Sequence, residues 1–286
     1  MKVIIDTHAG PCSGVKRALR MIEDELKQNN NVATLGPVIH NQVEIDRLNE
    51  LGVVTLDQES VSQNNFNVER GKRMIIRAHG IAKNLRNQLV NAGFELIDGT
   101  CPTVLKIQKD IERYYRDGYQ ILIVGNPNHP EVKGLNGQCD NQAAILQSED
   151  DIDHIRFSDK ALLISQTTVA FNKFLAIQKK ILQIAPHVIV KDTICRQVNS
   201  RHENIRNFAA DVDVVLLVGG KNSSNTRVLF EIAKQSNPHT FWIERQEDID
   251  GGWFAGCHCI GITGSASTPV WQLEHIKTYV ESVTLN

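Results

Sequence analysis

The sequence lacks several features that would each indicate a particular class of protein. Its purely apolar runs, such as residues 214–218, are far too short to span a bilayer, and the N-terminal segment has no signal-peptide pattern. Lys plus Arg (31) nearly balance Asp plus Glu (33), so no basic excess indicates nucleic acid or an anionic membrane as a partner. We therefore expect a soluble, cytoplasmic protein that binds neither.

Two common cofactor signatures are also missing. The six cysteines include no C-x-x-C pair, which excludes the usual zinc-ribbon and redox spacings. No G-x-G-x-x-G is present to indicate a tightly bound nicotinamide cofactor. In a reducing cytoplasm the cysteines are expected to be thiols or metal ligands rather than disulfides.

Short apolar runs alternate with amphipathic segments along the chain. Residues 119–125 and 213–220 are continuous apolar runs, the pattern of strands buried on both faces of a parallel sheet. Residues 15–28 place their apolar side chains at helical spacing. The pattern predicts an α/β fold built from βαβ units with mainly parallel sheets.

Three cysteines divide the chain into near-equal parts. Cys12 and Cys101 are 89 residues apart, Cys101 and Cys195 are 94 apart, and 91 residues follow Cys195. The spacing predicts three similar α/β modules, arranged about a pseudo-threefold axis with a central metal site. The predicted modules are residues 1–100, 101–194 and 195–286.

Polar residues recur at matching offsets from these cysteines. The residues 28 positions after them, where predicted strands end, are His40, His129 and Ser223. The polar ends of a later strand in each module, at offsets of 67, 66 and 72, are His79, Thr167 and Ser267. Ligands of open parallel sheets bind beyond the carboxyl ends of the strands. We therefore expect both sets to lie near the cysteines.

A thiol directly before a helix favours the thiolate that binds soft metals, and Pro102 after Cys101 suits the first helical turn. Three thiolates without a fourth protein ligand fit either catalytic zinc or an iron–sulfur cluster with one open iron. Spacing alone does not choose, although three equivalent cysteines favour the cluster. Cys139, Cys257 and Cys259 lie outside the repeat, and we expect them to be core thiols.

The polar strand ends form a set of hydrogen-bond donors suited to an anion. Residues 219–225 (GGKNSSN) follow a predicted strand and offer backbone N–H and hydroxyl donors at a helix N-terminus. With the three histidines they suit a phosphate or diphosphate; a zinc site on the histidines is the alternative. The expected donors are His40, His79, His129, Ser223, Ser224, Asn225 and Ser267.

Two further residues are candidates for proton transfer. Glu131, two residues after His129, offers a carboxyl group for proton donation; the alternative is an ordinary surface glutamate. Thr167 is placed to pass a proton or hold a substrate hydroxyl, and Gln166 and Thr168 compete with it for that role.

Nine motifs together resemble one known family. In chain order they are GPCSGVKRAL, LGPVIHN, RAHG, DGTCP, HPEVKGLNGQ, SQTT, DTIC, GGKNSSN and GITGSASTP. With them the chain resembles the 4-hydroxy-3-methylbut-2-enyl diphosphate reductase family, the last step of the non-mevalonate isoprenoid pathway, over essentially its whole length.

The resemblance implies an iron–sulfur reductase that removes the allylic hydroxyl of this diphosphate to give isopentenyl and dimethylallyl diphosphate. It implies a 4Fe–4S cluster with one iron not bound by the protein, held by Cys12, Cys101 and Cys195. It assigns the donors above to the diphosphate, proton supply to Glu131, and the substrate hydroxyl to Thr167. Ferredoxin or flavodoxin is the expected electron donor.

Two other functions use the same residues. One is a zinc-dependent hydrolase of a small phosphorylated substrate, with the three thiolates holding the metal. The other is a non-catalytic iron–sulfur sensor, which has no need of the polar strand ends.

Overall fold

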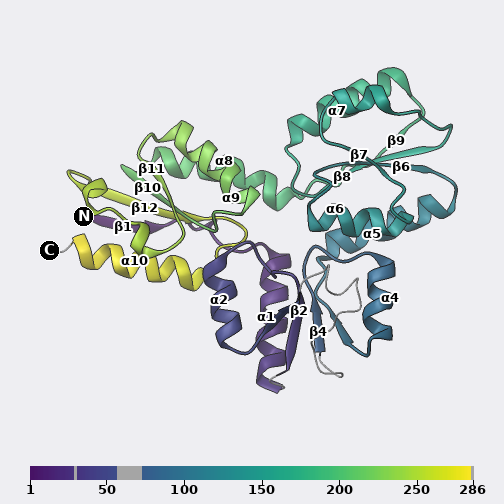
Figure 1. Cartoon of the computed structure of the whole chain (residues 1–286). Helices are drawn as coiled ribbons and strands as arrows, with labels where there is room; N and C mark the ends of the chain where they lie inside the picture. Colours follow the sequence, from purple (N-terminus) through teal and green to yellow (C-terminus); the bar gives the residue numbers. More distant parts are fainter. Residues whose placement is uncertain (29–30, 57–72, 285–286) are drawn as a thin grey trace. The chain divides into compact units, whose positions relative to one another are not determined.

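The computed structural model describes residues 1–28, 31–56 and 73–284 (Figure 1). These residues form three four-stranded sheets, and every strand pairing in them is parallel. The predicted α/β class with three parallel-sheet modules is confirmed. Their arrangement about a common axis stays a prediction. Among the described helices, none combines the length and the apolar character needed to cross a membrane.

The strands are short, as expected for buried parallel sheets. In sheet A they are β1 (Lys2–Ile5), β10 (Val214–Val218), β11 (Thr240–Ile243) and β12 (Cys259–Gly264). In sheet B they are β2 (Val32–Leu35), β3 (Val54–Leu56), β4 (Arg73–Ile76) and β5 (Glu95–Asp98). In sheet C they are β6 (Gln120–Val124), β7 (Ala144–Leu146), β8 (Ala161–Ser165) and β9 (Ile189–Val190).

Helices connect these strands. The α-helices in the first half are α1 (Ser13–Gln28), α2 (Gln42–Glu50), α4 (Lys83–Asn91), α5 (Pro102–Arg116) and α6 (Pro130–Asn136). Those in the second half are α7 (Phe171–Ile184), α8 (Arg196–Ala210), α9 (Ser224–Ser236) and α10 (Val270–Thr284). Short 3₁₀ turns are η1 (Gly137–Cys139), η2 (Asp150–His154), η3 (Gln246–Asp248) and η4 (Gly251–Phe254).

The three sheets share one strand order. Sheet B runs β3-β2-β4-β5, sheet C runs β7-β6-β8-β9, and sheet A runs β11-β10-β12-β1. In sheets B and C the last strand in this order, β5 or β9, follows the other three strands of its sheet in the chain. In sheet A that place is taken by β1 from the N-terminus, which pairs with β12. The repeat seen in the sequence is therefore a repeat of sheet topology.

The position of β1 differs from the predicted modules. β1 lies within residues 1–100, yet it completes the sheet formed by residues 214–264. Each of the three cysteines thus follows the last strand of a sheet, whereas the sequence analysis placed it at the start of a module. Pairing between chain ends carries no local pattern, so the spacing alone gave no sign of it. The module bounds otherwise stay a prediction.

The chain divides into two compact units. The first comprises Met1–Leu19, Pro37–Val53 and Ser200–Asn286, and contains sheet A. The second comprises Arg20–Gly36 and Val54–Asn199, and contains sheets B and C.

Both faces of the central strands are covered, which explains their continuous apolar runs. In β10, Val214, Leu216 and Val218 pack with α10, whereas Val215 and Leu217 pack with α8 and α9. In Figure 1, α10 lies along the sheet beside β1 and β12. At roughly 25 cal/mol per Å² of apolar surface, each such buried side chain contributes about 1.5–3 kcal/mol. The rigid sheet then holds the residues at its carboxyl edge.

Candidate functional site

The predicted site residues occupy equivalent places after equivalent strands. His40, His129 and Ser223 each lie five residues beyond the end of β2, β6 and β10. His79, Thr167 and Ser267 follow β4, β8 and β12 by two or three residues. Cys12, Cys101 and Cys195 follow β1, β5 and β9. The carboxyl edge of each sheet therefore presents one cysteine and two polar residues, as ligand-binding parallel sheets do.

Each of the three cysteines directly precedes a helix. Cys12 comes before α1, Cys101 before α5 and Cys195 before α8, and all three side chains are partly buried. The first N–H groups of a helix have no partner within the helix, and the helix dipole favours negative charge there. All three cysteines thus occupy equivalent positions at helix N-termini.

The other three cysteines lie in different surroundings. Cys139 is fully buried in an apolar cluster, and its burial raises the pKa of the thiol to about 11. Cys257 and Cys259 pack against the cores on opposite faces of sheet A. Burial also raises the pKa of the Cys257 thiol. Cys139 in particular stays a protonated core thiol at neutral pH, which separates it chemically from a metal ligand.

Backbone hydrogen bonds fix two of the repeated cysteines. The Cys101 N–H donates to the carbonyl of Ala78 (3.0 Å), the residue before His79. The Cys195 N–H donates to the carbonyl of Thr167 (2.9 Å). Both bonds join a cysteine to the polar end of the strand beside its own, so cysteine and polar residue are held as one piece within the second unit.

Glu131 is buried rather than on the surface. Its side chain is 2% exposed, and Thr167 binds both oxygens of its carboxyl group. The Thr167 N–H donates to Glu131 Oε1 (2.6 Å), and the Thr167 hydroxyl donates to Oε2 (2.8 Å). Burial raises the pKa of the carboxyl group, and the two bonds from Thr167 offset part of that rise. Glu131 is thus a buried acid in contact with a single hydroxyl.

The structure distinguishes Thr167 from its two competitors. Gln166 and Thr168 bond to each other, Gln166 Nε2 to Thr168 Oγ1 at 2.7 Å. Gln166 Oε1 also accepts from the Asn126 N–H (3.2 Å). Thr167 contacts Glu131 with its side chain and Cys195 with its backbone. Of the three residues, Thr167 is therefore the one whose side chain contacts the Glu131 carboxyl group.

Two histidines of the second unit lie side by side. The rings of His79 and His129 meet edge to face, with centroids 5.2 Å apart. His129 Nδ1 accepts from the Glu131 N–H (3.2 Å), which caps α6. A neutral ring that accepts at Nδ1 carries its proton on Nε2. His129 Nε2 is then a donor, the polarity that a phosphate oxygen requires.

The first unit brings Ser223 and Ser267 together. Their hydroxyl oxygens are 3.3 Å apart, and both side chains are almost fully buried. Ser223 caps α9 by accepting from the Thr226 N–H (3.2 Å), and Asn225 lies in the first turn of that helix. The side chain of Ser224 is outside the part that the structure describes. Hydroxyls beside a helix N-terminus form an anion-binding arrangement.

The backbone at His40 packs against Gly220, in the loop that leads to Ser223. A Cβ atom on Gly220 would lie 2.3 Å from the His40 carbonyl oxygen, so only glycine fits there without a shift. Asn41 caps α2 and donates from Nδ2 to Gln272 Oε1 (2.8 Å). Gln272 Nε2 donates in turn to the Glu244 carbonyl (2.7 Å). The contacts of Gly220, Asn41 and Gln272 join distant segments and were not predicted from the sequence.

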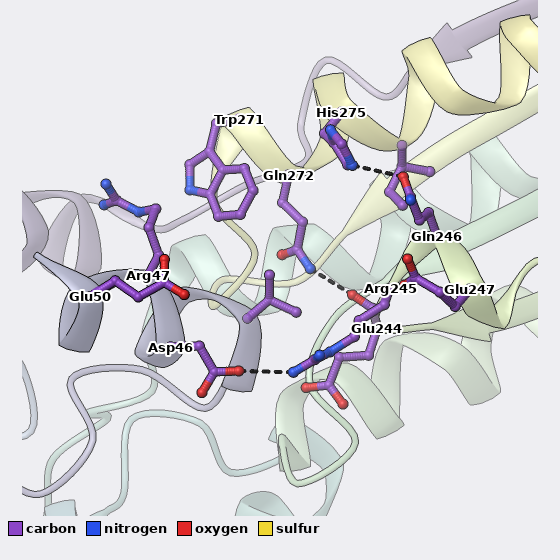
Figure 2. A pocket seen from close by; sticks show the side chains of 12 residues that line it. Asp46, Arg47, Glu50, Glu244, Arg245, Gln246, Glu247, Trp271, Gln272 and His275 are labelled. Carbon is purple, nitrogen blue, oxygen red and sulfur yellow. Dashed lines mark hydrogen bonds and ion pairs between the residues drawn. The ribbon is translucent and has the colours of Figure 1, made fainter.

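A hollow of about 420 Å³ lies beside this network in the first unit (Figure 2). Asp46 and Arg245 form an ion pair across it at 2.8 Å, and His275 Nε2 bonds Gln246 Oε1 at 2.9 Å. Gln272 forms part of its wall, but none of the predicted site residues does. Gln272 thus links the wall of the hollow to Asn41, the residue after His40.

The donor set fits an iron–sulfur group. The three repeated cysteines offer sulfur, a soft ligand, at helix N-termini, whereas Cys139 is buried and its raised pKa keeps it protonated. The polar strand ends carry N–H and O–H groups that can donate to an anion, and burial raises the pKa of the Glu131 carboxyl group. Such a set suits reduction of a small anionic substrate.

Comparison with known proteins identifies the family. A model of the LytB protein family matches residues 3–281. The chain belongs to the LytB family. Two relatives, both named 4-hydroxy-3-methylbut-2-enyl diphosphate reductase, come from Alkaliphilus oremlandii and Aquifex aeolicus. The first is 38% identical over 279 residues (96% of this chain, 98% of the relative), the second 36% over 285 residues (98% and 96%).

Solved structures extend the LytB comparison to the fold. The structure of (E)-4-hydroxy-3-methyl-but-2-enyl diphosphate reductase, the terminal enzyme of the non-mevalonate pathway, superposes with a TM-score of 0.77 at 36% identity. The alignment covers 99% of this chain and all of that one. The reductase from Plasmodium falciparum superposes with a TM-score of 0.83 at 24% identity, covering 97% and 87%, and supports the fold alone.

Proposed function

We propose that this LytB-family chain is a 4-hydroxy-3-methylbut-2-enyl diphosphate reductase. The reaction removes the allylic hydroxyl as water and gives isopentenyl diphosphate and dimethylallyl diphosphate, consuming two electrons and two protons. Near full-length similarity to proteins of that name supports the proposal. In the structure, the observation that carries it is the buried Glu131–Thr167 pair, bonded onward to the backbone of Cys195. The relatives lend no support to a zinc hydrolase or a sensor.

The LytB family consists of iron–sulfur enzymes, and we propose a 4Fe–4S cluster with one iron not bound by the protein. Cys12, Cys101 and Cys195 would hold it. When bound, such a group supplies a Lewis-acidic iron and a path for electrons. All other steps fall to the side chains of this chain, which hold the substrate, exclude water and deliver protons.

The proposed proton path begins at Glu131. Its raised pKa keeps the carboxyl group protonated to higher pH than an exposed glutamate, so it can act as an acid. The Thr167 hydroxyl lies 2.8 Å from the carboxyl group and would hold the substrate hydroxyl. Because Glu131 is 2% exposed, a proton it loses is replaced slowly from solvent except through this contact.

The polar strand ends would hold the diphosphate. In the first unit Ser223 and Ser267 present adjacent hydroxyls beside the N-terminus of α9, and His40 lies against the same loop. In the second unit His79 and His129 lie edge to face. Ser224 and Asn225 complete the proposed set. Fixing the diphosphate orients the allylic end of the substrate and lowers the entropy cost of reaction.

Ferredoxin or flavodoxin is the proposed electron donor, because the sequence has no nicotinamide fingerprint. The cytoplasm is the proposed compartment.

Anaerobic reconstitution tests the function directly. Protein loaded with iron and sulfide, given a chemical reductant and 4-hydroxy-3-methylbut-2-enyl diphosphate, should yield both isoprenoid diphosphates. Mass spectrometry identifies the products, and iron analysis gives the metal content. Phosphate release by a zinc-containing, iron-free protein would support the hydrolase instead. An iron-loaded protein that leaves the substrate unchanged would support the sensor.

Gly220→Ala should weaken substrate binding. The added Cβ would meet the His40 carbonyl oxygen at 2.3 Å, so either the His40 loop or the loop of residues 219–223 must shift. Overpacking of this kind costs about 1–3 kcal/mol of stability. A displacement of about 1 Å in a binding group costs up to about 100-fold in kcat/KM. We expect the loss mainly in KM, measured in the assay above.

Gly251→Ala is the matched control. It lies in the same unit, and a Cβ there meets no atom within 4 Å. Wild-type kinetics are expected. An unchanged KM in Gly220→Ala would show that the His40 loop does not contribute to substrate binding.

A further inference from the structure

A buried ion pair lies at the carboxyl edge of sheet A, outside the groups discussed so far. Asp6 follows β1 and is 4% exposed, and Arg201 on α8 is 8% exposed. Arg201 Nη2 lies 2.7 Å from Asp6 Oδ2. Thr263, a fully buried residue of β12, donates to the same oxygen at 2.8 Å and lies 2.6 Å from Arg201 Nη2. The three side chains form one closed network.

The network is poorly suited to stabilising the fold. Removing two charges from water costs several kcal/mol, which their attraction repays only when every remaining polar atom is paired. Arg201 Nε and Nη1 are buried and have no hydrogen-bond partner among the described residues. Replacing such a pair by apolar side chains is often neutral or stabilising. A contribution to stability therefore does not explain the network, and its role is better inferred from its position in the fold.

The segment that follows Asp6 leads directly to Cys12, and hydrogen bonds to Asp6 restrain its first residues. Asp6 Oδ1 accepts from the His8 N–H (2.8 Å), and the Asp6 carbonyl accepts from the Ala9 N–H (2.9 Å). Gly10 has a φ of +109°, which other residues rarely adopt. Pro11 then fixes its own φ near −65°. Hydrogen bonds to the Asp6 carboxylate and carbonyl thus fix the start of the short segment that ends at Cys12.

We propose that Asp6, Arg201 and Thr263 position Cys12 for binding of the iron–sulfur group. This inference rests on the proposed function, and it assigns Arg201 a positioning role in which it does not touch the substrate. Partners that orient a metal ligand typically change metal affinity 10–100-fold when removed. The network acts on the one cysteine ligand that belongs to the first unit.

Iron release tests the positioning role. Wild-type protein and Arg201→Met are reconstituted anaerobically, and transfer of iron to a ferrous chelator is followed well below the melting temperature of each apo-protein. We expect release from Arg201→Met to be about tenfold faster. Arg201→Lys keeps one charged donor for Asp6 but loses the planar fork, so an intermediate rate is expected. The electron paramagnetic resonance spectrum of the reduced protein should change in parallel.

Arg245→Met is the matched control, because Arg245 forms an ion pair with Asp46 at 2.8 Å in the same unit, on the surface. It should release iron like wild type. If Arg201→Met does not fold, Thr263→Val removes only the hydroxyl group, with its bonds to Asp6 and Arg201, and should show a smaller acceleration. Wild-type release rates in Arg201→Met, or in Thr263→Val when Arg201→Met fails to fold, would overturn the positioning role. Wild-type protein that takes up no iron would instead refute the proposed function.

Discussion

Glu131→Gln is expected to lower kcat by about 10²–10⁴-fold, the usual contribution of a positioned general acid. Glutamine has nearly the same shape, and its single side-chain oxygen can still accept one of the two Thr167 bonds, at 2.6 or 2.8 Å, but it has no acidic proton to give. Because Glu131 does not hold the iron–sulfur group in this proposal, iron content should equal that of wild type. Anaerobic turnover and iron analysis on the same preparation measure both quantities.

The matched control is Glu112→Gln, which removes a carboxylate from the same unit. Glu112 pairs with Lys83 on the surface, where single ion pairs contribute about 0–1 kcal/mol. Thr167→Val should reproduce much of the loss, and Thr167→Ser, which keeps a hydroxyl, should recover turnover. Normal turnover in Glu131→Gln would remove Glu131 from the proton path.

The pH dependence follows from the raised pKa of Glu131. As an acid, Glu131 is active while protonated, so kcat should fall as pH rises through its pKa, and the residual kcat of Glu131→Gln should lack this step. The same shift affects stability. Because the folded-state pKa is above the unfolded one, the contribution of Glu131 to stability is complete below the unfolded pKa and is lost as pH rises through the folded pKa. As pH rises over this range, the melting temperature of the apo wild-type protein should therefore fall relative to that of apo Glu131→Gln.

The repeat was predictable from the sequence because it produces local patterns of residues. Strands buried on both faces leave continuous apolar runs, and each run ends in a polar residue at a fixed offset from a cysteine. His129, His40 and Ser223 were found in this way, and each lies five residues beyond its strand in the structure. The position of Cys101 directly before α5 also agrees with the sequence, since Pro102 favours the first helical turn.

Contacts between distant segments were not predictable, because they leave no local period. β1 pairs with β12 across almost the whole chain, and Asn41 bonds Gln272 over 231 residues. The burial of Arg201 does correspond to a local pattern. With Ile205 and Ala209, Arg201 shares one buried face of α8 at intervals of four residues. A charged residue on an apolar helix face requires a buried partner. The sequence does not say that the partner is Asp6.

Replacing any one of Cys12, Cys101 and Cys195 by serine should abolish stable iron binding. Serine offers a harder oxygen ligand in place of a thiolate, and each cysteine occupies the same place after the last strand of its sheet. The loss in iron affinity should exceed the 10–100-fold typical of changes around a metal ligand. A 100-fold loss removes about 2.7 kcal/mol of the stabilisation that the bound group gives the fold. Iron content and the melting temperature after anaerobic reconstitution measure both effects.

Cys139→Ser separates this role from a general need for thiols. Cys139 is fully buried, its thiol donates to the Asn136 carbonyl at 3.2 Å, and its pKa of about 11 keeps it protonated. A serine hydroxyl can make the same bond, so iron content should stay at the wild-type level with at most a modest loss of stability. Equal loss of iron in all four variants would contradict the assignment, because the threefold repeat includes three of these cysteines and leaves Cys139 out. If only one of the variants at Cys12, Cys101 and Cys195 kept its iron, the cysteine replaced in that variant would not be a ligand. The other two cysteines would then hold the group with a ligand from elsewhere.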